Sequence, residues 1–247
     1  MRPRLLISND DGADSPFLPI FLEELSAVAD LEVVVPATEQ SWIGRAYSRH
    51  RKLTLGEVSV AGFKVKTIDG TPSDCVNIAL AHLCKPDAVV SGINIGQNIG
   101  IPLLWSSGTF SAAAEGACWG YPAFALSMRL EKNYYEACRL NHKMPAEGTL
   151  EENLRAASKK SAEYILDSLE SGFAKPHCVC NVNFPIRYAA DTPFKQCVPT
   201  KSEMASLYER NGDSFEFKYA IKPLPSSELT DFECLESGCA CHSRIFM

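Results

Sequence analysis

The sequence predicts an α/β protein with a doubly wound, mainly parallel sheet. Short apolar runs at residues 5–7, 31–35 and 88–91 have the length and composition of strands that are buried on both faces. Segments with apolar residues at helical spacing separate these runs. This alternation of strands and helices is typical of a parallel sheet that is covered by helices.

The chain begins with a predicted strand-helix-strand unit. Residues 4–8 should form a strand that ends at the polar turn 9–12 (NDDG). A helix should follow from about Pro16 with Ser15 as its N-cap, because a proline is tolerated where the first-turn N–H groups have no partner. The second strand, at residues 31–35, completes a crossover that should be right-handed.

The later segments continue the alternation. Ser73 is expected to cap a helix, and Thr149 and Glu152 have the spacing of a capping box. We divide the chain into a core, residues 1–190, and an extension, residues 191–247, that packs on the core as an oligomerisation arm. The other predicted core elements are a hairpin, helices and strands, in chain order at residues 52–66, 73–83, 88–91, 110–119, 123–128 and 179–184.

Composition excludes several classes of protein. The formal net charge of −6 argues against a protein that binds bulk nucleic acid, which needs a basic face. No run of about 18 apolar residues occurs, and the N-terminus has no signal-peptide pattern, so we expect a cytoplasmic protein that does not span a membrane. The ten scattered cysteines are then expected to be reduced and mostly buried.

Polar residues follow three of the predicted strands at the point where each strand ends. In an open α/β sheet, ligands bind outside the carboxyl ends of the strands. The three loops should therefore meet at one edge of the sheet. Their oxygen-bearing residues are Asn9, Asp10, Asp11, Ser41, Ser91, Asn94 and Asn98.

The adjacent carboxylates of Asp10 and Asp11 predict a divalent metal site. Like charges raise each other's pKa unless a countercharge compensates them, and a hard cation provides that charge. Ser41 and Asn94 complete a set of oxygen ligands that suits Mg²⁺, and Mn²⁺ accepts the same oxygens. We expect Asp10, Asp11 and Asn94 to take part in catalysis. Zinc is not expected here, because neither sulfur nor clustered imidazole accompanies these residues.

Two segments are suited to bind a phosphate group. The glycine-rich loop at residues 92–100 lets backbone N–H groups approach an anion, and the helix that opens at residues 107–109 adds a favourable dipole. Each feature alone is compatible with an ordinary turn or helix cap, and it is their combination at the strand ends that predicts a site. The candidate substrate-binding residues are Asn9, Gly92, Asn98, Ser107, Gly108 and Thr109.

Six motifs, in this order, resemble the stationary-phase survival protein family, SurE. They lie at residues 7–12 (ISNDDG), 70–75 (GTPSDC), 90–98 (VSGINIGQN), 107–116 (SGTFSAAAEG), 181–185 (NVNFP) and 230–232 (TDF). The resemblance covers most of the chain. It implies a Rossmann-like core, 5′(3′)-nucleotidase activity on nucleoside monophosphates, and C-terminal β-rich arms that are exchanged between the subunits of a homodimer or homotetramer.

The resemblance also assigns roles to residues. It implies that one divalent metal ion is held by Asp10, Asp11, Ser41 and Asn94, and that the phosphate lies near Asn98, Ser107, Gly108 and Thr109. The sequence departs from the family at residues 42–47 (WIGRAY), which are bulkier and more basic than the small polar residues usual there. We expect this loop to alter which base or leaving group fits.

The cysteine-rich C-terminus is the second departure from the family. Cys234, Cys239, Cys241 and His242 resemble a zinc-ligand set in composition, but their spacing matches no standard zinc pattern. We expect packed thiols there instead, and the resemblance implies a strand over residues 239–245.

The predicted reaction is metal-assisted hydrolysis of a phosphomonoester. The metal ion would bind a phosphoryl oxygen and offset the charge that develops there. Direct attack by an aspartate is the alternative chemistry, and we disfavour it because both carboxylates are assigned to the metal.

Three other classes of protein share part of this pattern. A receiver domain also has an acidic pair after its first strand, but it has about half this length and needs a later Asp and Lys. A haloacid-dehalogenase-type phosphatase needs an Asp where Thr67 stands before Asp69. A nucleotide-binding module without turnover would have the same residues, and metal-dependent phosphate release distinguishes the two.

Overall fold

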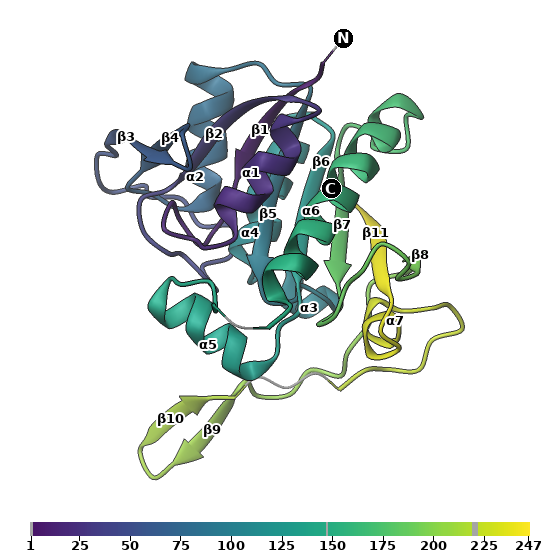
Figure 1. The fold of residues 1–247 in the computed structure, drawn as a ribbon. Helices are drawn as coiled ribbons and strands as arrows, with labels where there is room; N and C mark the ends of the chain where they lie inside the picture. The colour runs from purple at the N-terminus through teal and green to yellow at the C-terminus, as the bar shows by residue number, and fades with distance from the viewer. Residues whose placement is uncertain (1, 147, 219–221) are drawn as a thin grey trace.

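The computed structural model describes residues 2–146, 148–218 and 222–247, and its centre is one twisted sheet (Figure 1). Nine strands of the described residues form this sheet in the order β3-β4-β2-β1-β5-β6-β7-β11-β8. The six strands from β4 to β7 run parallel, as the sequence predicts. In chain order, the strands are β1 (Arg4–Ser8), β2 (Asp30–Pro36), β3 (Leu55–Val60), β4 (Phe63–Ile68), β5 (Ala88–Ile95), β6 (Ala123–Met128), β7 (Cys178–Phe184), β8 (Phe194–Gln196) and β11 (Ala240–Phe246).

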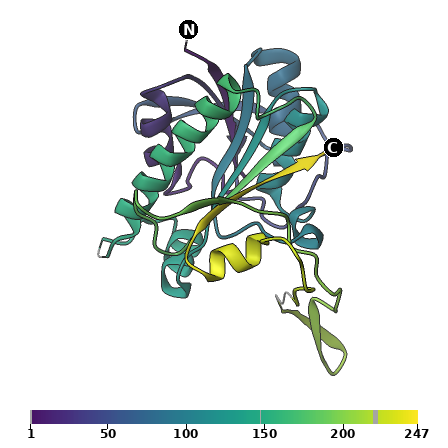
Figure 2. The same ribbon diagram turned by 90° about the vertical axis from the view of Figure 1, so that its right-hand side faces the viewer.

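Helices cover both faces of the sheet (Figures 1 and 2). Successive residues of β1 divide between the two layers: Leu5 and Ile7 pack with α1 and α6, whereas Leu6 packs with α2 and α4. This alternation follows from the period of two in a strand. The helical elements are α1 (Leu18–Ser26), α2 (Pro72–Ile78), a π-helical turn η1 (Ala79–Leu83), α3 (Ile101–Leu104), α4 (Gly108–Cys118), α5 (Lys132–Asn141), α6 (Leu150–Glu170) and α7 (Asp231–Glu236).

Two of the predicted helix caps, Ser15 and Ser73, are wrong, and a third, Thr149, is at the N-cap position but does not form the predicted capping box. Phe17, not Ser15, occupies the N-cap position of α1. The N-cap of α2 is Thr71, whose hydroxyl accepts from the Asp74 N–H at 3.1 Å while the Asp74 carboxylate accepts from the Thr71 N–H at 2.9 Å. Thr149 precedes α6 but makes no capping hydrogen bond with its side chain. Capping residues are common in turns, so residue type alone did not identify the caps.

Strand β5 is longer than the sequence suggests. Its apolar run stops at Ser91, but the strand continues to Ile95 through a register shift between Ser91 and Asn94. Gly92 therefore lies inside the strand, not in a loop, with a φ of +127°. A Cβ atom there would lie 2.3 Å from the Leu126 carbonyl oxygen of β6, so only glycine fits.

The C-terminal region contributes to the main sheet. Strand β11 pairs antiparallel with β7 and parallel with β8, so these parts of the extension complete the core. Strands β9 (Tyr208–Asn211) and β10 (Ser214–Phe217) instead form a separate hairpin that projects from the molecule (Figures 1 and 2).

The cysteine-rich end forms a small apolar cluster. Cys197, Cys234, Cys239 and Cys241 are buried together with Ile99 and Leu235. The ring of His242 stacks on Phe194 at 5.0 Å, and its Nδ1 lies 3.1 Å from the Tyr164 hydroxyl. In the described part of the chain, no helix is long and apolar enough to cross a bilayer.

Gly116 provides a test of the packing between α4 and β5. A Cβ atom at this residue would lie 2.6 Å from Val89 Cβ. Gly116→Ala should therefore lower the free energy of unfolding by about 1–3 kcal/mol, although alanine is the better helix former. Thermal unfolding measures the effect, with Lys159→Ala at an exposed position of α6 as the control. An unchanged melting temperature for Gly116→Ala would contradict this packing.

Candidate active site

The turn after β1 is closed by Asn9. Its Nδ2 donates to the Gly12 carbonyl at 3.0 Å, and its Oδ1 accepts from the Gly12 N–H at 3.0 Å. Gly12 adopts a φ of +82°, which suits glycine. Asn9 was predicted to bind substrate, and the structure shows that its amide fixes the turn that carries Asp10 and Asp11.

Asp10 lies at the N-terminus of α4. Its Oδ1 accepts a hydrogen bond from the Thr109 hydroxyl at 2.6 Å. A Cβ atom on Gly108 would lie 2.6 Å from Asp10 Cβ, so glycine permits the helix to approach the aspartate this closely. Ser107 caps α4 by accepting from the Phe110 N–H at 3.1 Å. The first turn of α4 thus holds the Asp10 carboxylate beside the positive end of the helix dipole.

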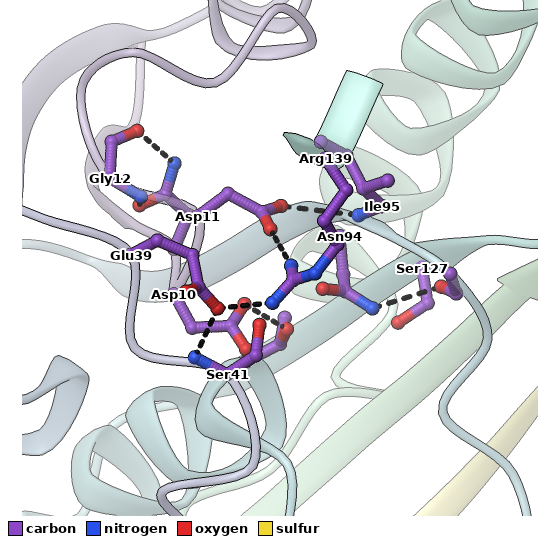
Figure 3. Close-up of polar contacts among 12 residues, drawn as sticks. Asp10, Asp11, Gly12, Glu39, Ser41, Asn94, Ile95, Ser127 and Arg139 are labelled. Carbon is purple, nitrogen blue, oxygen red and sulfur yellow. Dashed lines mark hydrogen bonds and ion pairs between the residues drawn. The ribbon is translucent and has the colours of Figure 1, made fainter. Parts of the chain in front are cut away.

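Asp11 is held by β5 and α5 (Figure 3). Its Oδ2 accepts from the Ile95 N–H at 3.1 Å, and its Oδ1 accepts from Arg139 Nη1 at 2.7 Å. The other terminal nitrogen of Arg139 donates to Glu39. Glu39 in turn accepts from the Ser41 N–H at 2.7 Å. Arg139 therefore connects the acidic pair to the loop that carries Ser41.

The charges at this site do not balance. Asp10, Asp11 and Glu39 face the single guanidinium of Arg139, which gives a formal charge of −2 when all are ionised. Burial raises the pKa of Asp10, against the hydrogen bond from Thr109 and the charge of Arg139. Burial and the neighbouring Asp10 raise the pKa of Asp11 to about 7, against the charge of Arg139. A divalent cation would offset the remaining charge.

Two asparagines lie beside the acidic pair. Asn94 Nδ2 donates to the Gly96 carbonyl at 2.9 Å, which orients the side-chain oxygen away from that contact. Asn98 donates its backbone N–H to Asn183 Oδ1 at 2.8 Å, and its carbonyl accepts from Asn181 and Asn183. Strand β7 thereby fixes the loop that follows β5.

A cavity of about 540 Å³ opens at this edge of the sheet, within the usual range for ligand pockets. Five predicted site residues line it: Asp10, Ser41, Asn94, Asn98 and Ser107. Its wall also contains Trp42, from the loop 42–47 that departs from the family pattern, and residues not singled out from the sequence, which include Arg129, Tyr135, Arg139 and Phe217. Among the described residues, the other predicted site residues do not line the cavity: Asn9, Asp11, Gly92, Gly108 and Thr109.

Sequence reasoning missed the two charged residues that connect the acidic pair to the Ser41 loop. Glu39 precedes the predicted ligand Ser41, and Arg139 belongs to α5, a helix that was not predicted. The uncompensated Asp10–Asp11 pair did indicate that a cation was required. The sequence has 24 lysines and arginines, and nothing in it distinguished Arg139 from the others.

Fold and site together define a class of protein. A buried acidic pair lies at the carboxyl edge of a Rossmann-like sheet, beside a helix N-terminus and a ligand-sized cavity. Such a site is suited to an anionic ligand bound together with a cation.

Comparisons with known proteins agree with this class. Residues 5–209 match the model of the family described as survival protein SurE. A protein of Solidesulfovibrio magneticus named 5′-nucleotidase SurE is 36% identical over 233 residues, which are 92% of this chain and 84% of that protein. A protein of Methanoculleus marisnigri with the same name is 35% identical over 188 residues, which are 76% of this chain and 69% of that protein.

A solved structure supports the same assignment. The crystal structure of SurE from Aquifex aeolicus superposes with a TM-score of 0.76 at 25% identity, over 99% of this chain and 93% of that one. The chain belongs to the SurE family.

The raised pKa of Asp11 predicts how stability depends on pH in metal-free protein. Because the folded-state pKa of about 7 lies above the ordinary value of 3.8, the native state binds the proton more tightly than the unfolded state. The contribution of the protonated Asp11 side chain to stability is fully present at low pH and is lost as the pH rises through 7.

The test compares wild type with Asp11→Asn in EDTA. Between pH 5 and pH 8, the free energy of unfolding of the wild type should fall by about 2 kcal/mol more than that of the variant. Denaturant titrations measure the difference. Asp14→Asn, which changes an exposed carboxylate nearby, should follow the wild type. Parallel pH profiles for wild type and Asp11→Asn would contradict the shifted pKa.

Proposed function

We propose that this protein is a metal-dependent phosphomonoesterase that hydrolyses nucleoside 5′-monophosphates to nucleoside and phosphate. The observation that carries the proposal is the buried Asp10–Asp11 pair, placed with excess negative charge beside the first turn of α4. Membership of a family with relatives named 5′-nucleotidase supports the choice of substrate.

The proposed metal ligands are Asp10, Asp11, Ser41 and Asn94. Their hard oxygen donors and the formal charge of −2 fit one divalent ion, Mg²⁺ or Mn²⁺. Among the described residues, no group of three or more His, Cys, Asp or Glu side chains could hold a metal ion. The proposed ligand set differs from such a group, because it has two carboxylates and takes its other oxygens from a serine and an asparagine. When bound, the ion would polarise a phosphoryl oxygen and acidify a water molecule.

The chain itself supplies groups for the phosphate. The Ser107 oxygen accepts from the Phe110 N–H, so its own hydroxyl hydrogen can be donated to a phosphoryl oxygen. The backbone of Asn98 is fixed by β7, and its side-chain Nδ2 donates one hydrogen to Ser127 Oγ at 2.9 Å, which leaves a second hydrogen for a ligand in the same cavity. The N-terminus of α4 adds a dipole that favours an anion. These groups bind and orient the ester, which is most of what phosphoryl transfer requires of a protein.

Arg139 supports this arrangement as a positioning residue. Its side chain is 14% exposed and its two terminal nitrogens hold Asp11 and Glu39 at fixed orientations. Because Glu39 also accepts from the Ser41 N–H, one guanidinium orients two of the proposed metal ligands. Water is the attacking group in this proposal, and trapping of a phosphoaspartyl enzyme would contradict it.

We further propose a cytoplasmic homodimer or homotetramer. All ten cysteines of the sequence are free thiols, which suits a reducing compartment. The C-terminal extension, whose strand β9 is exposed along its whole length, is the proposed contact between subunits.

Phosphate release from a panel of nucleoside monophosphates tests the activity. We expect release with Mg²⁺ or Mn²⁺, none with EDTA, and a loss of at least about 100-fold in kcat/KM for Asp10→Asn, because a metal ligand and its charge are weakened. Asp14→Asn serves as the control. Folded wild-type protein that binds nucleotide but releases no phosphate with any metal would leave a binding module as the function.

Thr109→Val tests the support behind Asp10. The substitution keeps the shape of the side chain but removes the hydrogen bond to Asp10 Oδ1. We expect the dissociation constant for Mn²⁺ to rise about 10- to 100-fold, as for other groups that orient metal ligands. Titration calorimetry measures it. Ser111→Ala is the matched control on the same helix, since the Ser111 hydroxyl has no hydrogen-bond partner in the described residues, and an equal effect in both variants would contradict the role of Thr109.

A further inference from the structure

Trp42 is placed at the cavity by an unusual backbone conformation. It follows Ser41 directly, and its φ of +60° lies in the left-handed region that bulky residues rarely adopt. Its side chain lines the same cavity as Asp10 and Ser107, and 46% of the residue is exposed. A large apolar side chain in a strained backbone beside a site suggests a role in that site, because strain of this kind persists only where the surroundings enforce it.

Hydrogen bonds on both sides of Trp42 enforce this conformation. The Gln40 N–H donates to the Asp10 carbonyl at 2.7 Å, and the Gly44 N–H donates to the Ser106 carbonyl at 3.0 Å. Gly44 is also in the left-handed region, and a Cβ atom there would lie 2.9 Å from the Trp105 carbonyl oxygen. The loop is therefore attached to the turn after β1 and to the segment before α4, which are the two parts that hold Asp10.

A buried carboxylate anchors the far end of the loop. The side chain of Glu115 on α4 is 2% exposed and accepts from Arg45 Nη2 at 2.7 Å and from the Tyr47 hydroxyl. Asn77 and Trp119 donate to its other oxygen at 2.8 and 3.0 Å. Arg45 and Tyr47 belong to the segment in which this chain departs from the family pattern. The departure thus includes both Trp42 and the two loop residues that donate to Glu115.

Phe217 of the β9–β10 hairpin contacts the Trp42 ring. It is the last residue of β10, and its ring contacts the indole edge-on with centroids 4.8 Å apart. Phe217 also lines the cavity and is 49% exposed. Neither ring belongs to a hydrophobic core cluster of the described residues. Two half-exposed aromatic rings therefore form one wall of a cavity that also contains Asp10, Asn94 and Ser107.

We propose that Trp42 and Phe217 form the nucleobase subsite, in which the base of the substrate stacks on the exposed aromatic surface while its phosphate lies at the acidic pair. The identity of the ligand as a nucleotide rests on the proposed function. Stacking suits every base, since each has a π face, and it favours purines because of their larger surface. The subsite thus predicts broad nucleotide specificity with a preference for purines.

The test separates the base from the phosphate. KM is measured for adenosine 5′-monophosphate and for ribose 5-phosphate, which lacks a base, with wild type and Trp42→Gly. Glycine removes the indole and accepts a φ of +60° without strain, so the melting temperature of the variant should not fall. We expect KM to rise about 10-fold for the nucleotide and less than about 2-fold for the sugar phosphate, with kcat little changed.

Three further variants locate the effect. Trp42→Phe retains an aromatic face and should restore most of the affinity for the nucleotide. Phe217→Ala should raise KM for the nucleotide as Trp42→Gly does. Phe215→Ala is its control, since Phe215 lies on the same strand and is 64% exposed but does not line the cavity of the described residues.

Equilibrium binding separates this inference from the proposed activity. The dissociation constant of adenosine 5′-monophosphate is measured in EDTA, where no turnover is expected. Weaker binding by Trp42→Gly supports the subsite even if the wild type releases no phosphate. Equal nucleotide KM and Kd values for wild type and Trp42→Gly overturn the subsite, even if the wild type is an active nucleotidase. Equal losses for nucleotide and ribose 5-phosphate also overturn it, because the loop would then support only the phosphate side.

Discussion

The two adjacent carboxylates of Asp10 and Asp11 are the constraint on which the rest of the site depends. They are 3% exposed, so water does little to separate their charges. The protein surrounds them with the Thr109 hydroxyl, the Ile95 N–H and the Arg139 guanidinium, and each comes from a different element. These donors reduce the repulsion without removing it, as the raised pKa of Asp11 shows. The remaining charge is what makes the site suitable for a cation.

The packing of the core brings these donors to the pair. Gly108 lets α4 begin against Asp10, where any larger residue would collide with its side chain. The register shift in β5 brings Asn94 and the Ile95 N–H to the carboxyl edge of the sheet. Gly108 lies in a helix and the register shift lies in a central strand, so both belong to rigid elements. The acidic end of the cavity is therefore preorganised, which is what a reaction controlled by positioning and charge requires.

The other end of the cavity has a different construction. Trp42 belongs to a loop and Phe217 to a projecting hairpin, and neither is part of the main sheet. Loops tolerate sequence change more readily than buried strands do. The aromatic end of the cavity can thus change in sequence while the acidic end stays the same. The loop is nevertheless fixed in place, because Arg45 and Tyr47 donate to the buried carboxylate of Glu115, which Asn77 and Trp119 hold from outside the loop.

The sequence by itself determined the alternation of strands and helices in the core, its parallel sheet, and the meeting of Asp10, Ser41 and Asn94 at one edge of the sheet. These follow from local hydrophobic patterns and from the rule that parallel strands present their carboxyl ends together. Only the tertiary structure revealed the partners of those residues. Arg139 and Glu39 are typical surface residues by sequence, and Gly92 looks like a loop glycine until β6 lies against it. Contacts between residues far apart in the chain depend on how the elements pack, and no local pattern records that packing.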